Sequence, residues 1–222
     1  MFEAVLFDLD GTLADTAPDL GGAANRLRQE ADLPPLPLAA LRPHTSQGVR
    51  GLLRESFAVA PGDPDYDRLA ARFLELYAAQ ICVETRLFAG IGDLLTELEG
   101  AGIGWGIVTN KRTRYTTPVV AALGLAGRTP CVVSGDTTAA AKPSPLPILH
   151  ACTLLACAPQ RTLYVGDDIR DIAAGRAAGT RTAAVSYGYL GDGGPIDTWG
   201  ADFIADHPEQ LLGYILGQPG TR

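Results

Sequence analysis

Short apolar runs alternate with helix-like segments over most of the chain, and this alternation predicts the fold. The first run, 4–7, contains no polar residue and predicts a strand that is buried on both faces. Later strand-like runs lie at 105–109, 130–134, 162–165, 182–185 and 203–205. Helical segments lie before and between them, at 91–100, 117–124, 145–156 and 169–178. The pattern is typical of an α/β fold in which helices cover both faces of a doubly wound parallel sheet.

The segment after the first strand has a different pattern. Apolar residues at helical spacing, separated by proline-rich breaks, predict helices over 16–30, 46–57 and 66–82 without a strand among them. We therefore predict an all-helical cap domain, residues 16–84, inserted after the first strand into an α/β core made of 1–15 and 85–222. The glycine-rich stretch 188–195 predicts a surface loop, and the chain from Gly217 onward predicts a frayed end.

The composition is that of an ordinary globular protein, and it argues against several classes of function. The chain has 222 residues, of which 46% are hydrophobic and 19% charged, and its formal net charge is −7. This acidic balance argues against a nucleic-acid partner, because such binders need a basic surface to neutralise phosphates. No apolar window reaches the ~18 residues of a membrane-spanning helix, and the start of the chain does not resemble a signal peptide.

The cysteines and histidines do not form a metal-binding pattern. The four cysteines lack a CxxC spacing, so we expect reduced thiols and a cytoplasmic location. The three histidines, His44, His150 and His207, are scattered along the chain, and we expect them to be structural. For the assembly we expect a monomer or a homodimer.

Polar side chains follow three of the predicted strands at the point where each ends. Asp8 and Asp10 come after the first strand, and Asp167 and Asp168 come after the run 162–165. The run 105–109 ends with Thr109, which is followed by Asn110 and Lys111. In a doubly wound sheet, ligands bind beyond the carboxyl ends of the strands. Two carboxylates two residues apart on an extended chain can share a divalent cation. A simple acidic turn is the alternative, but the similar groups at the later strands favour a reactive site.

Four motifs in this order resemble those of the haloacid dehalogenase superfamily. They are Asp-x-Asp-Gly-Thr at 8–12, hydrophobic-Thr-Asn at 108–110, Lys-Pro-x-Pro at 142–145 and Gly-Asp-Asp-Ile-Arg-Asp at 166–171. The helical insertion resembles the first cap class (C1) of that superfamily. Residues 15–20 and 87–90 resemble its phosphoglycolate phosphatase branch. Residues 166–172, 179–189 and 199–208 resemble the N-acetylmuramic acid 6-phosphate phosphatases of that branch.

The resemblance implies a phosphatase that acts through a phosphoaspartate on a small phosphorylated metabolite, with 2-phosphoglycolate and N-acetylmuramic acid 6-phosphate as candidates. Asp8 would be the nucleophile and Asp10 the acid and base. Thr109, Asn110 and Lys142 would hold the phosphoryl oxygens. Ser144 stands where relatives commonly have an acid. The resemblance therefore does not predict the hydrogen bonds around this residue, whereas the predicted reaction is unaffected.

The resemblance also implies a Mg²⁺ site. The side chains of Asp8 and Asp167 and the main-chain carbonyl of Asp10 would bind the ion. Asp171 and Asp168 would stand behind the metal, although acidic residues in a first helical turn also serve as caps.

Further residues are candidates for contact with substrate. Gly11 and Thr12 would shape the phosphate-binding turn. Lys111 is a further candidate, and the alternative is a solvated helix start together with Arg112 and Arg114. In the helical insertion the candidates are Gln47, Gly48 and Arg50, although Arg50 could equally be an exposed helix charge.

Two other functions share these motifs. A sugar phosphomutase would use the same residues but protect its phosphoenzyme from water. A non-catalytic module that binds a phosphorylated ligand would be expected to lack one of the key groups. True dehalogenation is disfavoured, because Asp10 supplies a proton that a departing halide does not need.

Overall fold

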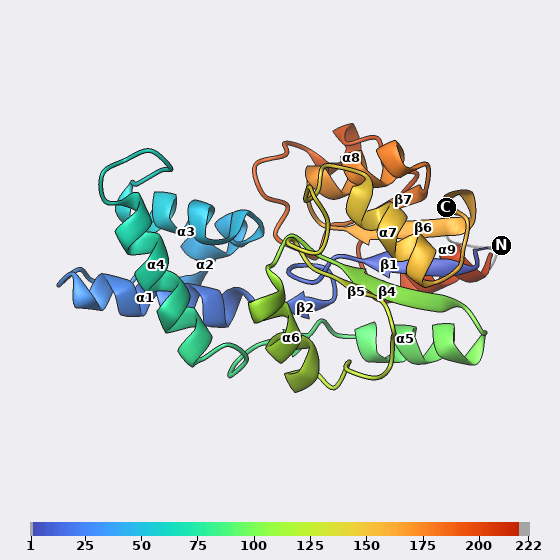
Figure 1. The fold of residues 1–222 in the computed structure, drawn as a ribbon, viewed down its shortest axis with the longest axis horizontal. Coiled ribbons are helices and arrows are strands. Elements are labelled where there is room, and N and C mark those ends of the chain that lie inside the picture. Colours follow the sequence, from blue (N-terminus) through green and yellow to red (C-terminus); the bar gives the residue numbers. More distant parts are fainter. Residues whose placement is uncertain (1, 218–222) are drawn as a thin grey trace.

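The computed structural model describes residues 2–217, and its centre is a parallel sheet (Figure 1). The six strands are β1 (Ala4–Phe7), β4 (Gly104–Val108), β5 (Val132–Val133), β6 (Thr162–Gly166), β7 (Arg181–Val185) and β8 (Phe203–Ala205). Their spatial order is β5-β4-β1-β6-β7-β8, and every neighbouring pair is parallel. The order reverses beside β1, because the chain first moves outward through β4 and β5 and then returns to the other side through β6.

The two faces of the sheet have separate hydrophobic cores. Val5 and Phe7 pack in a core that includes side chains of α5 (Ile91–Gly100), α6 (Thr113–Ala122) and α9 (Pro208–Leu216). Leu6 points to the opposite face, where α7 (Leu146–Leu154) and α8 (Ile169–Ala178) cover the sheet. Since successive strand residues alternate between faces, β1 must be apolar at every position. The predicted α/β fold class is confirmed.

A second group of helices forms its own core beside the sheet (Figure 1). It comprises α1 (Ala17–Glu30), α2 (Leu38–Leu41), the 3₁₀ helix η1 (Arg42–Gln47), α3 (Gly48–Phe57) and α4 (Tyr66–Ala79). Leu20, Leu53 and Phe73 are buried at its centre, and Tyr115 of α6 packs against them. We call this group the helical unit; the division of the chain into domains at residues 16 and 84 stays a proposal.

Two short strands that were not predicted join the connections to the helical unit. β2 (Ala14–Asp15) pairs in antiparallel fashion with β3 (Arg86–Leu87). Beside them, the buried Asp19 carboxylate accepts main-chain hydrogen bonds from Val83, Glu84 and Thr85 at 2.8–3.1 Å. Strands of two residues leave no periodic pattern, which is why the sequence did not indicate them.

Several predicted boundaries were wrong for identifiable reasons. Helix α6 begins at Thr113 instead of 117, because Asp136, far away in sequence, accepts hydrogen bonds from its main-chain N–H and hydroxyl at 2.8 and 2.6 Å. The run 130–134 forms only the two-residue strand β5, which pairs with β4 alone. The expected helix over 46–57 is divided between η1 and α3.

The remaining connections contain the 3₁₀ helices η2 (Pro159–Arg161) and η3 (Ile196–Thr198). In the predicted surface loop 188–195, Tyr189 is buried, with 4% of its surface exposed. The predicted frayed end falls mostly on 218–222, which lie outside the described residues. Over residues 2–217, no helix has both the length and the hydropathy needed to cross a bilayer.

Candidate active site

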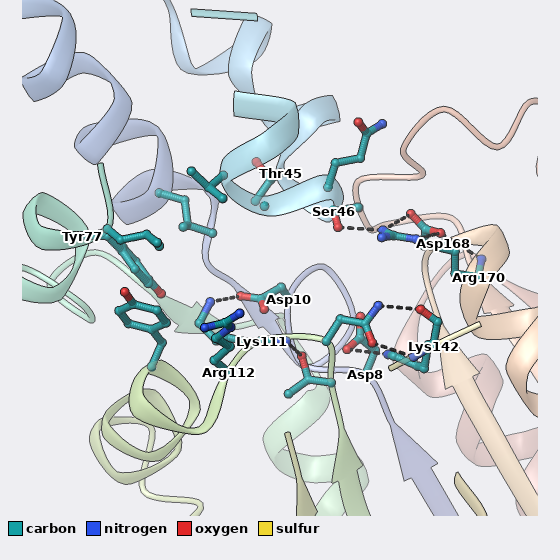
Figure 2. A pocket seen from close by; sticks show the side chains of 18 of the residues that line it. Asp8, Asp10, Thr45, Ser46, Tyr77, Lys111, Arg112, Lys142, Asp168 and Arg170 are labelled. Carbon is teal, nitrogen blue, oxygen red and sulfur yellow. Dashed lines mark hydrogen bonds and ion pairs between the residues drawn. The ribbon is translucent and has the colours of Figure 1, made fainter. Parts of the chain in front are cut away.

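The carboxyl ends of β1, β4 and β6 bring the predicted site residues together. These strands are neighbours in the sheet, with β1 in the middle. A cavity of about 290 Å³ lies between their ends and the helical unit (Figure 2). The strand-end and loop residues that line it include Asp8, Asp10, Thr109, Asn110, Lys111 and Lys142. The three strand ends therefore open into one site, as the sequence predicted.

Three carboxylates meet at the base of the site. One oxygen each of Asp8, Asp167 and Asp171 lies within 4.8 Å of the others. The side chains of Asp167 and Asp171 are fully buried, and that of Asp8 is 13% exposed. Such proximity is unfavourable for like charges unless a cation or a proton lies among them.

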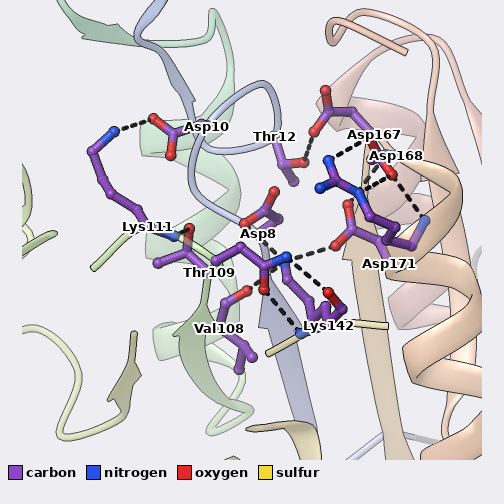
Figure 3. Close-up of polar contacts among 12 residues, drawn as sticks. Asp8, Asp10, Thr12, Val108, Thr109, Lys111, Lys142, Asp167, Asp168 and Asp171 are labelled. Carbon is purple, nitrogen blue, oxygen red and sulfur yellow. Dashed lines mark hydrogen bonds and ion pairs between the residues drawn. The ribbon is translucent and has the colours of Figure 1, made fainter. Parts of the chain in front are cut away.

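Lys142 supplies one positive charge to this cluster. Its ammonium lies 2.9 Å from Asp8 Oδ1 and 2.7 Å from Asp171 Oδ1 (Figure 3). It also donates hydrogen bonds to the Val108 carbonyl and the Tyr164 hydroxyl, each at 2.8 Å. Burial lowers the pKa of Lys142, but the two carboxylates outweigh this effect and raise that pKa above its ordinary value. Lys142 therefore stays charged beside the nucleophile candidate.

One ammonium does not balance three carboxylates. Burial, reinforced by Asp8 and Asp171, raises the pKa of Asp167 well above its ordinary value. Burial likewise raises the pKa of Asp171 to about 7, against the opposing effect of Lys142. Asp8 Oδ1 is buried without a hydrogen bond of good geometry from the described residues, although Lys142 is close. An oxygen-rich, under-neutralised cluster of this kind fits a hard divalent cation.

Gly11 and Thr12 position Asp167 instead of lining the cavity. Thr12 Oγ1 donates a hydrogen bond to Asp167 Oδ1 at 2.9 Å (Figure 3). Gly11 has a φ of +91°, and a Cβ at this position would overlap the Asp167 carboxylate. A side chain is also excluded at Gly188, which packs against Asp167 and the Gly11 carbonyl. The turn after β1 is therefore shaped around the buried acid.

Asp10 points to a different part of the site. Its Oδ1 atom accepts hydrogen bonds from Thr16 Oγ1 at 2.6 Å and from Lys111 Nζ at 2.7 Å. Burial lowers the pKa of Lys111, but the Asp10 carboxylate outweighs this and holds that pKa above its ordinary value. Lys111 also lies 4.9 Å from the centre of the Tyr77 ring. Lys111 is thus a buried cation in the cavity wall, and its interpretation as a solvated helix start was wrong.

The residues that follow β4 contact the main chain of Lys142 and line the cavity. Asn110 donates from Nδ2 to the Lys142 carbonyl and accepts from the Lys142 N–H, both at 2.9 Å. Thr109 is 3% exposed, and its Oγ1 accepts the Lys111 N–H at 3.1 Å. Both residues line the cavity, and the side chain of Asn110 also holds the main chain of Lys142.

Asp168 and Asp171 both cap helix α8, which was the alternative to a metal role. Asp168 accepts the Arg170 N–H at 2.9 Å, and Asp171 accepts the Asp168 N–H at 3.1 Å. Asp171 also reaches the acidic cluster and Lys142. Asp168 instead pairs with the Arg170 guanidinium at 2.8 Å (Figure 2). Asp171 therefore belongs to the acidic cluster, whereas Asp168 pairs with Arg170.

Of the three candidates in the helical unit, two line the cavity and one does not. Gln47 and Gly48 line the cavity, whereas Arg50 is exposed and is not among the lining residues. The exposed-charge interpretation of Arg50 therefore fits the structure, and we drop Arg50 from the proposed contacts.

Other lining residues were not found from the sequence. Arg112 and Arg170 add guanidinium groups, and an apolar part of the wall is formed by Leu20, Val49, Phe73, Leu74, Tyr77 and Tyr115. Burial raises the pKa of Tyr77 to about 12, so this residue stays a neutral phenol. The helical spacing of Phe73 and Tyr77 indicated only a core face, because cavity-lining and core residues on one helix share the same period.

Comparison with known proteins agrees with this geometry. A family model described as haloacid dehalogenase-like hydrolase matches residues 5–185. The chain therefore belongs to the haloacid dehalogenase-like hydrolase family.

Individual relatives narrow the class further. The chain is 42% identical over 210 residues to an N-acetylmuramic acid 6-phosphate phosphatase of Pseudomonas aeruginosa, covering 95% of this chain and 93% of that protein. It is 43% identical over 209 residues to a phosphoglycolate phosphatase of Xanthomonas campestris pv. campestris, covering 94% of each. A crystal structure described as a predicted phosphoglycolate phosphatase from Haemophilus somnus aligns with a TM-score of 0.84 and 26% identity, covering 96% of this chain and 97% of that one.

The protein is thus a phosphatase, as the motifs implied. Phosphatases of this kind act on small phosphorylated substrates, and hydrolases of the family generally use a divalent metal. The acidic cluster of Asp8, Asp167 and Asp171 is consistent with such an ion.

Proposed function

We propose that this phosphatase hydrolyses a phosphate monoester of a small metabolite by way of a phosphoaspartate on Asp8, with Mg²⁺ as its metal. The observation that supports this most strongly is the position of Asp8. It follows the central strand, lines the cavity, lies 2.9 Å from the Lys142 ammonium and contributes an oxygen to the acidic cluster. A nucleophilic carboxylate needs this combination of access and neutralised surroundings.

In the first step an Asp8 oxygen attacks phosphorus as the bond from phosphorus to the alcohol oxygen breaks. Asp10 gives a proton to the departing alkoxide. In the second step Asp10 takes a proton from water, which attacks phosphorus and releases phosphate from Asp8. Lys142 and Thr109 hold the phosphoryl oxygens, since phosphoryl transfer depends mainly on positioning and on charge neutralisation.

Asp8, Asp167 and the main-chain carbonyl of Asp10 would hold Mg²⁺. When bound, the ion would neutralise the carboxylates and polarise the phosphoryl group. The uncompensated charge of the buried carboxylates supports this assignment.

The size of the cavity favours N-acetylmuramic acid 6-phosphate, the larger of the two substrates for which relatives are named. The cavity has a volume of about 290 Å³. The two-carbon acid 2-phosphoglycolate would leave much of this space filled with water. N-acetylmuramic acid 6-phosphate, with a sugar ring and an N-acetyl group, offers carbon-rich surface to the apolar wall of Leu20, Val49 and Phe73.

We also propose a cytoplasmic location, which the four free thiols support.

A phosphate-release screen tests this proposal. The panel contains N-acetylmuramic acid 6-phosphate, 2-phosphoglycolate and a hexose 1-phosphate, each with Mg²⁺ or with EDTA. We expect Mg²⁺-dependent release of phosphate, with the highest kcat/KM on N-acetylmuramic acid 6-phosphate. A higher kcat/KM on 2-phosphoglycolate would overturn the substrate assignment, and isomer in place of phosphate from the hexose 1-phosphate would indicate a mutase.

A further inference from the structure

Tyr189 connects three parts of the site through a single side chain and its own backbone. It lies after Gly188 in the connection that follows β7 and is 4% exposed. Its hydroxyl accepts the main-chain N–H groups of Thr16 at 2.7 Å and Ala17 at 2.9 Å, and it donates to Asp15 Oδ1 at 3.0 Å. Its main-chain N–H donates to Asp167 Oδ2 at 2.8 Å.

The hydroxyl of Tyr189 fixes the main chain at the start of helix α1. The first N–H groups of a helix have no partner within the helix, and a threonine at the N-cap usually accepts one of them. Thr16 is the N-cap residue of α1, yet its side chain makes no capping hydrogen bond. Tyr189 accepts the N–H groups of Thr16 itself and of Ala17, the first residue of the helix, and so fixes the main chain at Thr16. The Thr16 hydroxyl makes its hydrogen bond outside the helix.

The hydroxyl of Thr16 binds Asp10. Thr16 Oγ1 donates to Asp10 Oδ1 at 2.6 Å, and Lys111 Nζ donates to the same oxygen at 2.7 Å (Figure 3 shows the Lys111 contact). Among residues 2–217, none donates a hydrogen bond to the other oxygen, Asp10 Oδ2. Both donors bind Oδ1, so they fix the orientation of the carboxyl group and leave Oδ2 as the oxygen that can contact a substrate.

We propose that Tyr189 is a positioning residue for the proton transfer by Asp10, acting through the main chain and the hydroxyl of Thr16. The inference rests on the proposed function, in which Asp10 protonates the leaving alkoxide. We call residues 15–17, which the Tyr189 hydroxyl contacts, the linker; Tyr189 is not among the residues that line the cavity. It fixes the linker, the linker presents the Thr16 hydroxyl, and that hydroxyl orients the carboxyl of Asp10.

The test compares two leaving groups. An alkyl phosphate needs a proton on its departing oxygen, whereas p-nitrophenyl phosphate releases a stabilised phenoxide that does not. We would measure kcat/KM, which includes the first phosphoryl transfer, with p-nitrophenyl phosphate and with N-acetylmuramic acid 6-phosphate, or with 2-phosphoglycolate if the panel selects it. Asp10→Asn should lose at least ~10²-fold on the alkyl ester and much less on the aryl ester.

Tyr189→Phe keeps the ring and the main-chain N–H to Asp167 and removes only the hydroxyl. We expect about a tenfold loss on the alkyl ester and less than about twofold on the aryl ester. Thr16→Val should show the same bias, and Thr16→Ser, which keeps a hydroxyl, should restore the alkyl activity. Combining Tyr189→Phe with Thr16→Val should add little to Thr16→Val alone. Tyr214→Phe, in α9 and stacked on Phe203, is the matched control and should change neither activity.

The outcomes separate the inference from the proposed function. Equal losses on both esters in Tyr189→Phe, or no loss, would overturn the role of Tyr189 if Asp10→Asn still shows the bias. Absence of the bias in Asp10→Asn would overturn the acid role of Asp10 itself. If Tyr189→Phe does not fold, as judged by its thermal transition, the pair Thr16→Val and Thr16→Ser decides: a bias without rescue by serine would contradict the proposal.

Discussion

Arg170 of α8 donates a hydrogen bond from Nη2 to the main-chain carbonyl of Ser46 in η1 at 2.7 Å. The contact joins α8, which packs on the sheet, to the helical unit at the cavity (Figure 2). Asp168 holds the guanidinium in place, because its carboxylate accepts hydrogen bonds from Arg170 Nε and Nη2, each at 2.8 Å. The hydrogen bond to the Asp168 carboxylate raises the pKa of Arg170, although burial acts in the opposite direction. We infer that the Asp168–Arg170 pair fixes the helical unit over the site.

Arg170→Gln should loosen this closure. A hydrogen bond that involves a charged group is worth ~1.5–3 kcal/mol, so we expect KM to rise about tenfold. Amide hydrogen exchange over 42–57 in the substrate-free protein should become faster, a readout that does not depend on substrate contact. Arg54→Gln is the matched control, because Arg54 also ties the helical unit to the rest of the chain, through Asp192 at 2.7 Å, but both side chains are about half exposed. Equal exchange in the two variants would contradict the role of Arg170.

Asp167→Asn should separate metal binding from folding. Removal of one buried carboxylate relieves repulsion from Asp8 and Asp171, so the metal-free variant should be at least as stable as the metal-free wild type. Mg²⁺ should raise the Tm of the wild type, because a ligand at 100 times its Kd contributes ~2.7 kcal/mol to the free energy of unfolding. In Asp167→Asn this increase should be lost. Thermal unfolding with EDTA and with Mg²⁺ measures both effects, and an equal Mg²⁺ shift in the variant would remove Asp167 from the metal site.

The Cys131 thiol should make stability depend on alkaline pH. Burial, reinforced by Cys152 and Cys157, raises its pKa to about 12, whereas an unfolded cysteine titrates near ~8.5. The folded state therefore retains the proton while the unfolded state loses it, and the free energy of unfolding falls as the pH rises from ~8.5 towards 12. At pH ~10 the thiol should account for about 2 kcal/mol of this fall. Urea unfolding at pH ~8 and ~10 gives the fall in the free energy of unfolding between the two pH values for the wild type and for Cys131→Ala. An equal fall in the two proteins would contradict the prediction.

Much of the fold was predictable because its signals are local. The apolar run of β1 and the alternation after Leu87 follow from residues close together in sequence. The start of α6 was not predictable, since Asp136 stabilises it from another part of the fold. The same reason explains the missed strands β2 and β3, whose pairing joins residues 14–15 to 86–87.

The site was predictable where its residues follow strands directly, as Asp8 and Asp167 do. The role of Tyr189 could not be predicted, because a tyrosine in a glycine-rich stretch does not indicate that its hydroxyl accepts N–H groups at the start of a distant helix. Lys111 was ambiguous for a related reason. Its neighbours Arg112 and Arg114 are exposed, and only the fold shows that Lys111 turns inward to Asp10.

The chemical role of Asp8 is the centre of the account, and acid-quenched peptide mapping tests it most directly. Wild-type protein mixed with Mg²⁺ and substrate, and quenched before turnover is complete, should carry a phosphoryl group on the peptide that contains Asp8. Asp8→Asn should lack this group and release phosphate at least ~10³-fold more slowly. Phosphate release by Asp8→Asn at a rate near that of the wild type would contradict the account.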